Sequence, residues 1–141
     1  MDSPPTTCDT ILFVDDEEKA RKYFKLIFGG NYRILTAADG QEALEICRSW
    51  RDEIKVVVTD QIMPRMTGLE LLGKLRAEEA PMIRILSTAY ADSGMVSTAV
   101  DDGLLDCFIG KPWKIEKFGG ILQQALLRGG SREPQPLGTA E

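Results

Sequence analysis

Short apolar segments alternate with amphipathic segments along most of this 141-residue chain. Most of the apolar segments are rich in Ile, Val and Leu on both faces, which is typical of parallel strands that helices cover on both sides. We expect strands at Thr10–Val14, Tyr32–Thr36, Lys55–Thr59, Met82–Ser87 and Asp106–Ile109.

The segments between these strands show the apolar spacing of helices. In each of them apolar residues recur at i, i+3, i+4 and i+7 and form one stripe. The five stripes begin at Ala20, Ala43, Gly68, Met95 and Phe118. Gly29-Gly30, Gly103 and Gly129-Gly130 stand where helices should end.

Five strand–helix units with short links predict an α/β fold with a parallel sheet and right-handed crossovers. We expect a flavodoxin-like (βα)5 three-layer sandwich with strand order 2-1-3-4-5. The domain should span residues 10–128. Residues 1–9 and 129–141 are expected to be a flexible N-terminus and a flexible tail or linker stub, because Gly, Pro and polar residues there cannot build a core.

Composition excludes several classes of function. The net charge of -5 offers no broad attraction to nucleic acid or anionic lipid, and no apolar run is long enough to span a membrane. The three cysteines are scattered without zinc-type spacing, which favours a reduced, cytoplasmic protein. The absence of histidine excludes Ser-His-Asp chemistry, histidine-based zinc sites and a role as histidine phosphodonor.

Carboxylates follow two of the predicted strands. Asp60 comes directly after Val56–Thr59, and Asp15 and Asp16 come after Ile11–Val14. In the expected strand order the first and third strands are neighbours, so these three side chains should meet at the carboxyl edge of the sheet. Three carboxylates repel one another, and hard oxygen ligands without Cys or His suit Mg²⁺.

The remaining strand ends add a hydroxyl and an ammonium group. Thr88 follows the fourth expected strand and Lys111 follows the fifth. Metal, hydroxyl and ammonium together would hold a phosphoryl group, whose transfer needs mainly positioning and charge stabilisation. Asp60 is ionised at neutral pH and can act as a nucleophile without a general base.

The chain resembles the receiver domains of bacterial response regulators, the CheY-like superfamily of two-component systems, over about residues 9 to 128. The residues that carry the resemblance fall in the family's order. They are Phe13-Val14-Asp15-Asp16, Val58-Thr59-Asp60-Gln61-Ile62-Met63-Pro64, Gly68, Ser87-Thr88-Ala89 and Lys111-Pro112-Trp113.

The resemblance implies a role for each matching position. Asp60 would accept a phosphoryl group from a phosphohistidine on a partner histidine kinase or phosphotransfer protein. Asp16, Asp60 and the backbone carbonyl of Ile62 would bind Mg²⁺ (or Mn²⁺) directly, and Asp15 would act largely through a bound water. The chain would be a phosphorylated signalling switch rather than an enzyme, with only self-directed phosphotransfer and autodephosphorylation.

The resemblance also implies a switch. Thr88 would hydrogen-bond the phosphoryl group, Lys111 would pair with one of its oxygens, and Phe108 would turn inward when Thr88 moves. The surface of the fourth helix, fifth strand and fifth helix would then change, which could control a fused or docked output domain or a dimer. No direct nucleic-acid or membrane binding is expected of this segment, and its kinase and output are not readable.

Some positions depart from the family pattern. Phe108 stands where Tyr is common, and Trp113 stands where Phe is more common after Lys-Pro. Ile62 and Tyr90, two residues after Asp60 and Thr88, are bulky and not acidic. We hypothesise that they restrict attacking water and slow the loss of phosphate.

Simpler readings exist for each residue alone. Asp16 could cap the helix that begins near Glu17, Asp60 could form a turn, and Thr88 and Lys111 could be ordinary capping and surface residues. A haloacid-dehalogenase-type phosphatase would need an Asp two residues after its nucleophile, where this chain has Ile62. A flavodoxin-type FMN module would need a phosphate loop instead of acids after the first strand, and a degenerate receiver would not need the complete acidic set.

Overall fold

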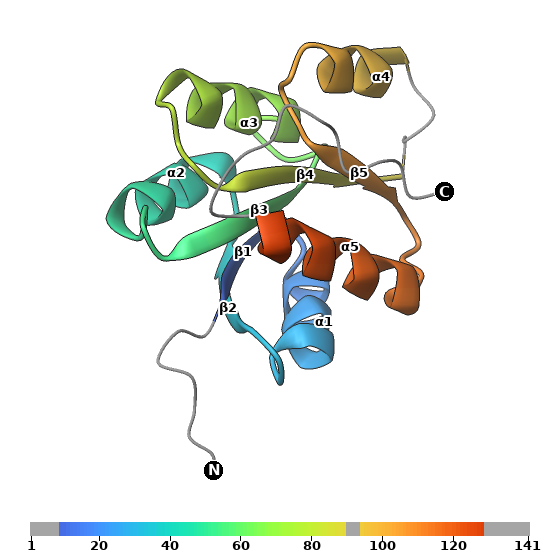
Figure 1. Cartoon of the computed structure of the whole chain (residues 1–141). Helices are drawn as coiled ribbons and strands as arrows, with labels where there is room; N and C mark the ends of the chain where they lie inside the picture. Colours follow the sequence, from blue (N-terminus) through green and yellow to red (C-terminus); the bar gives the residue numbers. More distant parts are fainter. Residues whose placement is uncertain (1–8, 90–93, 129–141) are drawn as a thin grey trace.

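The structure is a computed structural model that describes residues 9–89 and 94–128. Within these ranges strands and helices alternate from β1 to α5 (Figure 1). The strands are β1 (Thr10–Val14), β2 (Arg33–Ala37), β3 (Ile54–Asp60), β4 (Ile83–Thr88) and β5 (Cys107–Gly110). The helices are α1 (Glu18–Phe28), α2 (Gly40–Ser49), α3 (Gly68–Ala77), α4 (Gly94–Asp101) and α5 (Ile115–Arg128).

All strand pairs are parallel, and the sheet order is β2-β1-β3-β4-β5. The predicted fold class and strand order are therefore confirmed. The second strand begins one residue later than expected, because the backbone N–H of Tyr32 still donates to the carbonyl of Phe28 in the turn that ends α1. The third and fourth strands run on to include Asp60 and Thr88.

Two apolar clusters hold the three layers together. Helices α1 and α5 cover one face of the sheet, and α2, α3 and α4 cover the other (Figure 1). The α1/α5 side is rich in aromatic rings from Phe13, Phe24, Phe28 and Phe118, all buried. The opposite side is built largely from Leu, Val and Met, and Phe108 packs against it. Burial of these side chains on both faces supplies the main driving force for the fold.

The start of α3 is defined by a capping box. The side-chain oxygen of Thr67 accepts from the backbone N–H of Glu70, and the Glu70 carboxylate accepts from the backbone N–H of Thr67. Each bond satisfies a backbone donor that the first turn of a helix leaves without a partner. The loop between Asp60 and α3 therefore has a fixed end.

Several expectations concern residues at or beyond the described ranges. Most of the predicted flexible segments, together with Cys8 and Tyr90, lie outside the described residues. Asp9 is described, and its carbonyl accepts from the backbone N–H of Arg33 at 2.9 Å. None of the described helices has the length and apolar character that crossing a membrane requires.

Candidate functional site

Four neighbouring strands carry the predicted site residues to one edge of the sheet. Asp15 and Asp16 follow β1, and Asp60 is the last residue of β3. Thr88 is the last residue of β4, and Lys111 directly follows β5. Because β1, β3, β4 and β5 are parallel and adjacent in that order, all five residues lie at the carboxyl edge of the sheet.

The three carboxylates come close together. One oxygen from each of Asp15, Asp16 and Asp60 lies within 4.8 Å of the others. The ammonium nitrogen of Lys111 lies 3.2 Å from Asp15 Oδ2 and 3.5 Å from Asp60 Oδ2. The expected meeting of these side chains is therefore observed in the structure.

Asp15 is fully buried, and its position is fixed by several contacts. Its Oδ1 accepts from the backbone N–H of Glu17 at 3.0 Å, and its carbonyl accepts from the guanidinium of Arg21 at 2.8 Å. The alternative that Asp16 caps α1 is wrong, since the N-cap residue is Glu17 and its side chain makes no capping bond. The helix begins at Glu18, two residues after Asp16, and the Asp16 side chain is left exposed at the site.

Asp60 is fixed by the loop that follows it. Its Oδ1 accepts from the backbone N–H of Gln61 at 2.8 Å. The buried Gln61 side chain accepts from the backbone N–H of Leu69 at 2.8 Å, and the Gln61 carbonyl accepts from the N–H of Gly68 at 3.0 Å. Sequence reasoning missed this role of Gln61. The available signal was a side-chain amide beside the loop that leads into a helix N-terminus, where donors lack partners.

Charge and burial oppose each other at Asp60 and Lys111. Burial raises the pKa of Asp60 and the Asp15 carboxylate raises it further, although Lys111 and the N–H of Gln61 act in the opposite direction. Burial alone would lower the pKa of Lys111, but Asp15 and Asp60 more than offset this effect and the pKa is raised. One ammonium thus faces two carboxylates, those of Asp15 and Asp60.

A pocket of about 310 Å³ opens over this group. Its lining combines acidic, hydroxyl and ammonium groups with the exposed side chain of Ile62. The lining residues are Asp16, Glu17, Asp60, Ile62, Thr88, Ala89 and Lys111. Phe108 does not line the pocket, and it is half-buried against the α2/α3/α4 side of the core. Its role as a switch residue stays a prediction.

The acidic cluster fits a hard divalent cation. Its carboxylate oxygens carry more negative charge than Lys111 compensates, and at least one of them, from Asp16, is exposed. Oxygen ligands of this kind, without Cys or His, suit Mg²⁺ or Mn²⁺, which need only one or two protein carboxylates and keep several waters. The donor set observed here therefore agrees with the cation expected from the sequence.

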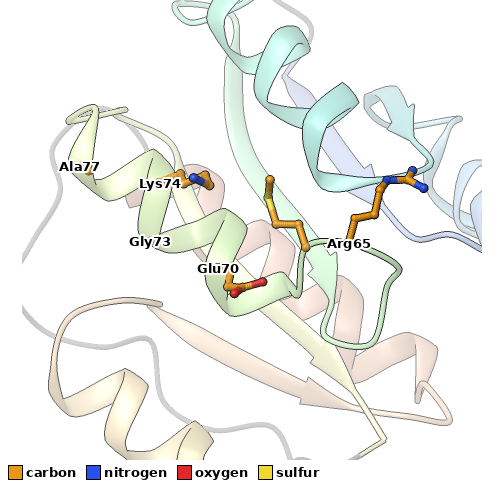
Figure 2. A pocket seen from close by; sticks show the side chains of 6 residues that line it. Arg65, Glu70, Gly73, Lys74 and Ala77 are labelled. Carbon is orange, nitrogen blue, oxygen red and sulfur yellow. The ribbon is translucent and has the colours of Figure 1, made fainter.

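A second hollow lies along α3 (Figure 2). Figure 2 shows Glu70 and Lys74 on successive turns of the helix, with Arg65 reaching from the preceding loop. The Arg65 guanidinium is 3.1 Å from the Asp39 carboxylate at the start of α2. The residues that line this hollow include none of the predicted site residues.

Trp113 lies in the aromatic cluster between α1 and α5. Its indole N–H also donates to the hydroxyl of Ser87 at 2.8 Å, a contact that sequence reasoning missed. Cys107 is buried as expected for a strand residue. Trp50 packs against the α2/α3/α4 side of the core.

Comparison with known proteins places this geometry in a family. A family model described as the response regulator receiver domain matches residues 11–123. Among curated proteins, the hydrogenase transcriptional regulatory protein HoxA of Cupriavidus necator is 29% identical over 117 residues. That match covers 83% of this chain and 24% of HoxA, so the chain spans about a quarter of that relative's length.

Solved structures agree in fold. The signal receiver domain of an HD domain-containing protein from Pseudomonas fluorescens Pf-5 superposes with a TM-score of 0.80 at 26% identity, covering 89% of this chain and 99% of that one. The response regulator TrrA from Thermotoga maritima, solved in complex with Mg²⁺ and BeF, gives a TM-score of 0.72 at 28% identity. That match covers 84% of this chain and 99% of TrrA.

Proposed function

The chain belongs to the response regulator receiver domain family, and from this premise we propose that it is a phosphoacceptor switch with Asp60 as the acceptor. The observation that carries the proposal is the acidic cluster at the sheet edge, with three carboxylates within 4.8 Å of one another. Lys111 lies 3.5 Å from Asp60 and supplies the positive charge that an arriving phosphoryl group needs.

In the proposed reaction an oxygen of the Asp60 carboxylate attacks the phosphorus of a phosphohistidine on a partner protein. The new P–O bond forms an acyl phosphate. The P–N bond breaks, and its electron pair returns to the imidazole nitrogen, which then takes a proton. Because this chain contains no histidine, the donor imidazole belongs to another molecule or another domain.

A divalent cation held by Asp16, Asp60 and the carbonyl of Ile62, with Asp15 acting through water, would neutralise charge on the transferring phosphoryl oxygens. Lys111 would pair with one of these oxygens. Thr88, the last residue of β4 and part of the pocket lining, would hydrogen-bond another. The TrrA structure with Mg²⁺ and BeF supports a site of this chemistry in a relative.

The readout we propose is a change of the α4–β5–α5 surface when Thr88 and Phe108 respond to the phosphoryl group. A fused or docked output domain, or a second copy of the chain, would recognise that surface. The receiver from Pseudomonas fluorescens comes from an HD domain-containing protein, which supports control of a larger protein. We also propose that the chain acts in the cytoplasm.

Mass measurement after incubation with Mg²⁺ and acetyl phosphate tests the proposal. We expect the wild-type chain to gain one phosphoryl group, and no gain when EDTA removes the metal. Asp60→Asn should stay unmodified, while the matched control Asp52→Asn, at an exposed position, should be labelled like the wild type. An unmodified wild-type chain, under conditions that label another receiver domain in parallel, would overturn the proposal.

A further inference from the structure

The segment between β5 and α5 is tied to the end of β4 at two points. The backbone N–H of Lys111 donates to the carbonyl of Thr88 at 3.1 Å. Two residues later, the indole N–H of Trp113 donates to the hydroxyl of Ser87 at 2.8 Å. Ser87 and Thr88 are the last two residues of β4. The segment that carries the Lys111 ammonium is therefore fastened both at Lys111 and beyond it.

Ser87 is buried near the end of β4. It is 1% exposed and pairs with Asp60 across the β3–β4 ladder. Side chains alternate along a strand, so Ser87 shares a face with Ile83 and Ile85, which belong to the α1/α5 core. A hydroxyl buried in an apolar layer is costly without a partner, and Trp113 supplies one.

The Trp113 ring has little freedom to move. Its centroid lies 5.5 Å from Phe13 and 5.1 Å from Phe118, both in edge-to-face contact. Tyr23 stacks on the Trp113 ring with an interplanar angle of 11°, and the Phe24 ring centroid lies 6.0 Å from that of Trp113. Packing from three elements thus fixes the direction of the indole N–H.

Resting on the proposed phosphoacceptor function, we propose that Trp113 is a positioning residue for the phosphotransfer reaction and acts through Lys111. The bond from Trp113 to Ser87 holds the segment so that the Lys111 ammonium stays between Asp15 and Asp60. A lysine side chain has four rotatable bonds, so a loosened backbone would spread its charge over many positions. Stabilisation of a transferring phosphoryl group depends on charge that is already in place.

Trp113 differs from a Phe at the same position in one respect that matters here, which is the indole N–H that donates to Ser87. A Phe at this position, common in the family pattern, would fill similar space without offering a hydrogen bond. Trp113→Phe therefore removes the bond and keeps an aromatic ring. Ser87→Ala removes the acceptor and keeps the whole indole, so the inference stays testable if one of the two variants fails to fold.

The experiment measures the initial rate of Mg²⁺-dependent phosphorylation by acetyl phosphate. We expect Trp113→Phe and Ser87→Ala each to lower this rate about fivefold to tenfold, the effect typical of losing one hydrogen bond. The double variant should be no slower than either single variant, because both changes remove the same bond. Trp50→Phe, at the other tryptophan, is the matched control and should leave the rate unchanged.

Two further measurements separate positioning from a general structural effect. In a Lys111→Ala background, followed over longer times, Trp113→Phe should have no additional effect, because its action passes through the missing ammonium. Calorimetric titration should show that Trp113→Phe binds Mg²⁺ at least as tightly as the wild type does. The hydrogen bond that this variant loses does not involve the three carboxylates.

The outcomes are distinguishable. A wild-type chain that is not phosphorylated contradicts the proposed function itself. If the wild type is phosphorylated and both single variants are phosphorylated at the wild-type rate, only the role of Trp113 is overturned. A rate loss that persists in the Lys111→Ala background also overturns it, because the ring would then act through the fold and not through Lys111.

Discussion

At the scale of a residue, Gly68 shows how little room separates the loop after Asp60 from the sheet. A Cβ at Gly68 would meet the carbonyl oxygen of Asp60 and a methyl group of Leu86. The Asp60 carbonyl is backbone and cannot rotate away as a flexible side chain would. The close approach therefore depends on the absence of a side chain at this position.

Gly68→Ala is expected to lower the free energy of unfolding by about 1–3 kcal/mol, the usual cost of overpacking. Gly120→Ala is the matched control in α5, because a Cβ there would meet nothing within 4 Å. It should raise stability by about 0.5–1 kcal/mol, since Ala is the better helix former. Urea unfolding followed by circular dichroism measures both values, and equal effects of the two changes would contradict the packing argument.

The two described cysteines should be unreactive in the folded protein. Burial raises the pKa of both Cys47 and Cys107 to about 12, from an ordinary value of 9.0. At about pH 10 an unfolded thiol is largely ionised and reacts, while these two stay protonated. Iodoacetamide should therefore label them at about pH 10 only after denaturant is added, as measured by peptide mass mapping. Rapid labelling of either thiol in the folded chain would disagree with this expectation.

Residue-level prediction from the sequence worked for charges and failed for hydrogen-bond partners. Asp15, Asp60 and Lys111 could be placed together because strand ends and strand order determine where they lie. The hydrogen bond from Trp113 to Ser87 could not be predicted, because it depends on how the ring packs among aromatic side chains distant in sequence.

At the scale of elements, Arg84 joins β4 to the loop between α4 and β5. It is 5% exposed, yet its guanidinium donates to the carbonyls of Leu104 and Gly103 at 2.8 and 2.9 Å. The Asp106 carboxylate accepts from the Arg84 backbone N–H, and the Arg84 carbonyl accepts from the N–H of Asp106. A positive charge next to the C-terminal end of α4 also suits the helix dipole.

Arg84→Met should lower the free energy of unfolding by at least about 2 kcal/mol, because the carbonyls of Gly103 and Leu104 lose the charged donor that the buried Arg84 side chain supplies. Amide hydrogen exchange should also rise in the loop from Gly103 to Asp106. Arg48→Met is the matched control, since its ion pair with Glu78 is exposed and should matter little. Similar losses of stability for the two variants would contradict the argument that the Arg84 hydrogen bonds to Leu104 and Gly103 hold this loop.

The elements themselves were largely predictable, with strand bounds within one residue of those expected. Apolar periodicity locates a helix or strand, but the last hydrogen bond of a neighbouring turn decides where it begins, as at Tyr32. The hydrogen bonds from Arg84 in β4 to the loop before β5 were not predicted, because their acceptors are backbone carbonyls, which every residue has.

At the scale of the whole molecule, the acidic cluster should couple metal binding to stability. A ligand that binds only the folded chain stabilises it, by about 2.7 kcal/mol at ~100 times its dissociation constant. We expect Mg²⁺ to raise the melting temperature, and NaCl of equal ionic strength to raise it less. Without Mg²⁺, Asp60→Asn should be more stable than the wild type, because it removes repulsion from Asp15 and Asp16.

Differential scanning calorimetry with and without Mg²⁺ checks both parts of this expectation. The stabilisation by Mg²⁺ should be much smaller in Asp60→Asn, while Asp52→Asn should behave like the wild type. An equal response of Asp60→Asn and the wild type to Mg²⁺ would contradict the assignment of the cluster as the metal site.

The contact between Lys111 and Asp15 joins residues 96 positions apart in the chain. A ribosome makes the chain from its N-terminus, so Asp15 and Asp60 are synthesised well before their ammonium partner. The aromatic ring that holds the segment, Trp113, comes later still, and Phe118 after it. A nascent chain therefore cannot bring these groups together until translation has passed Lys111, close to the end of the range 11–123 that matches the family.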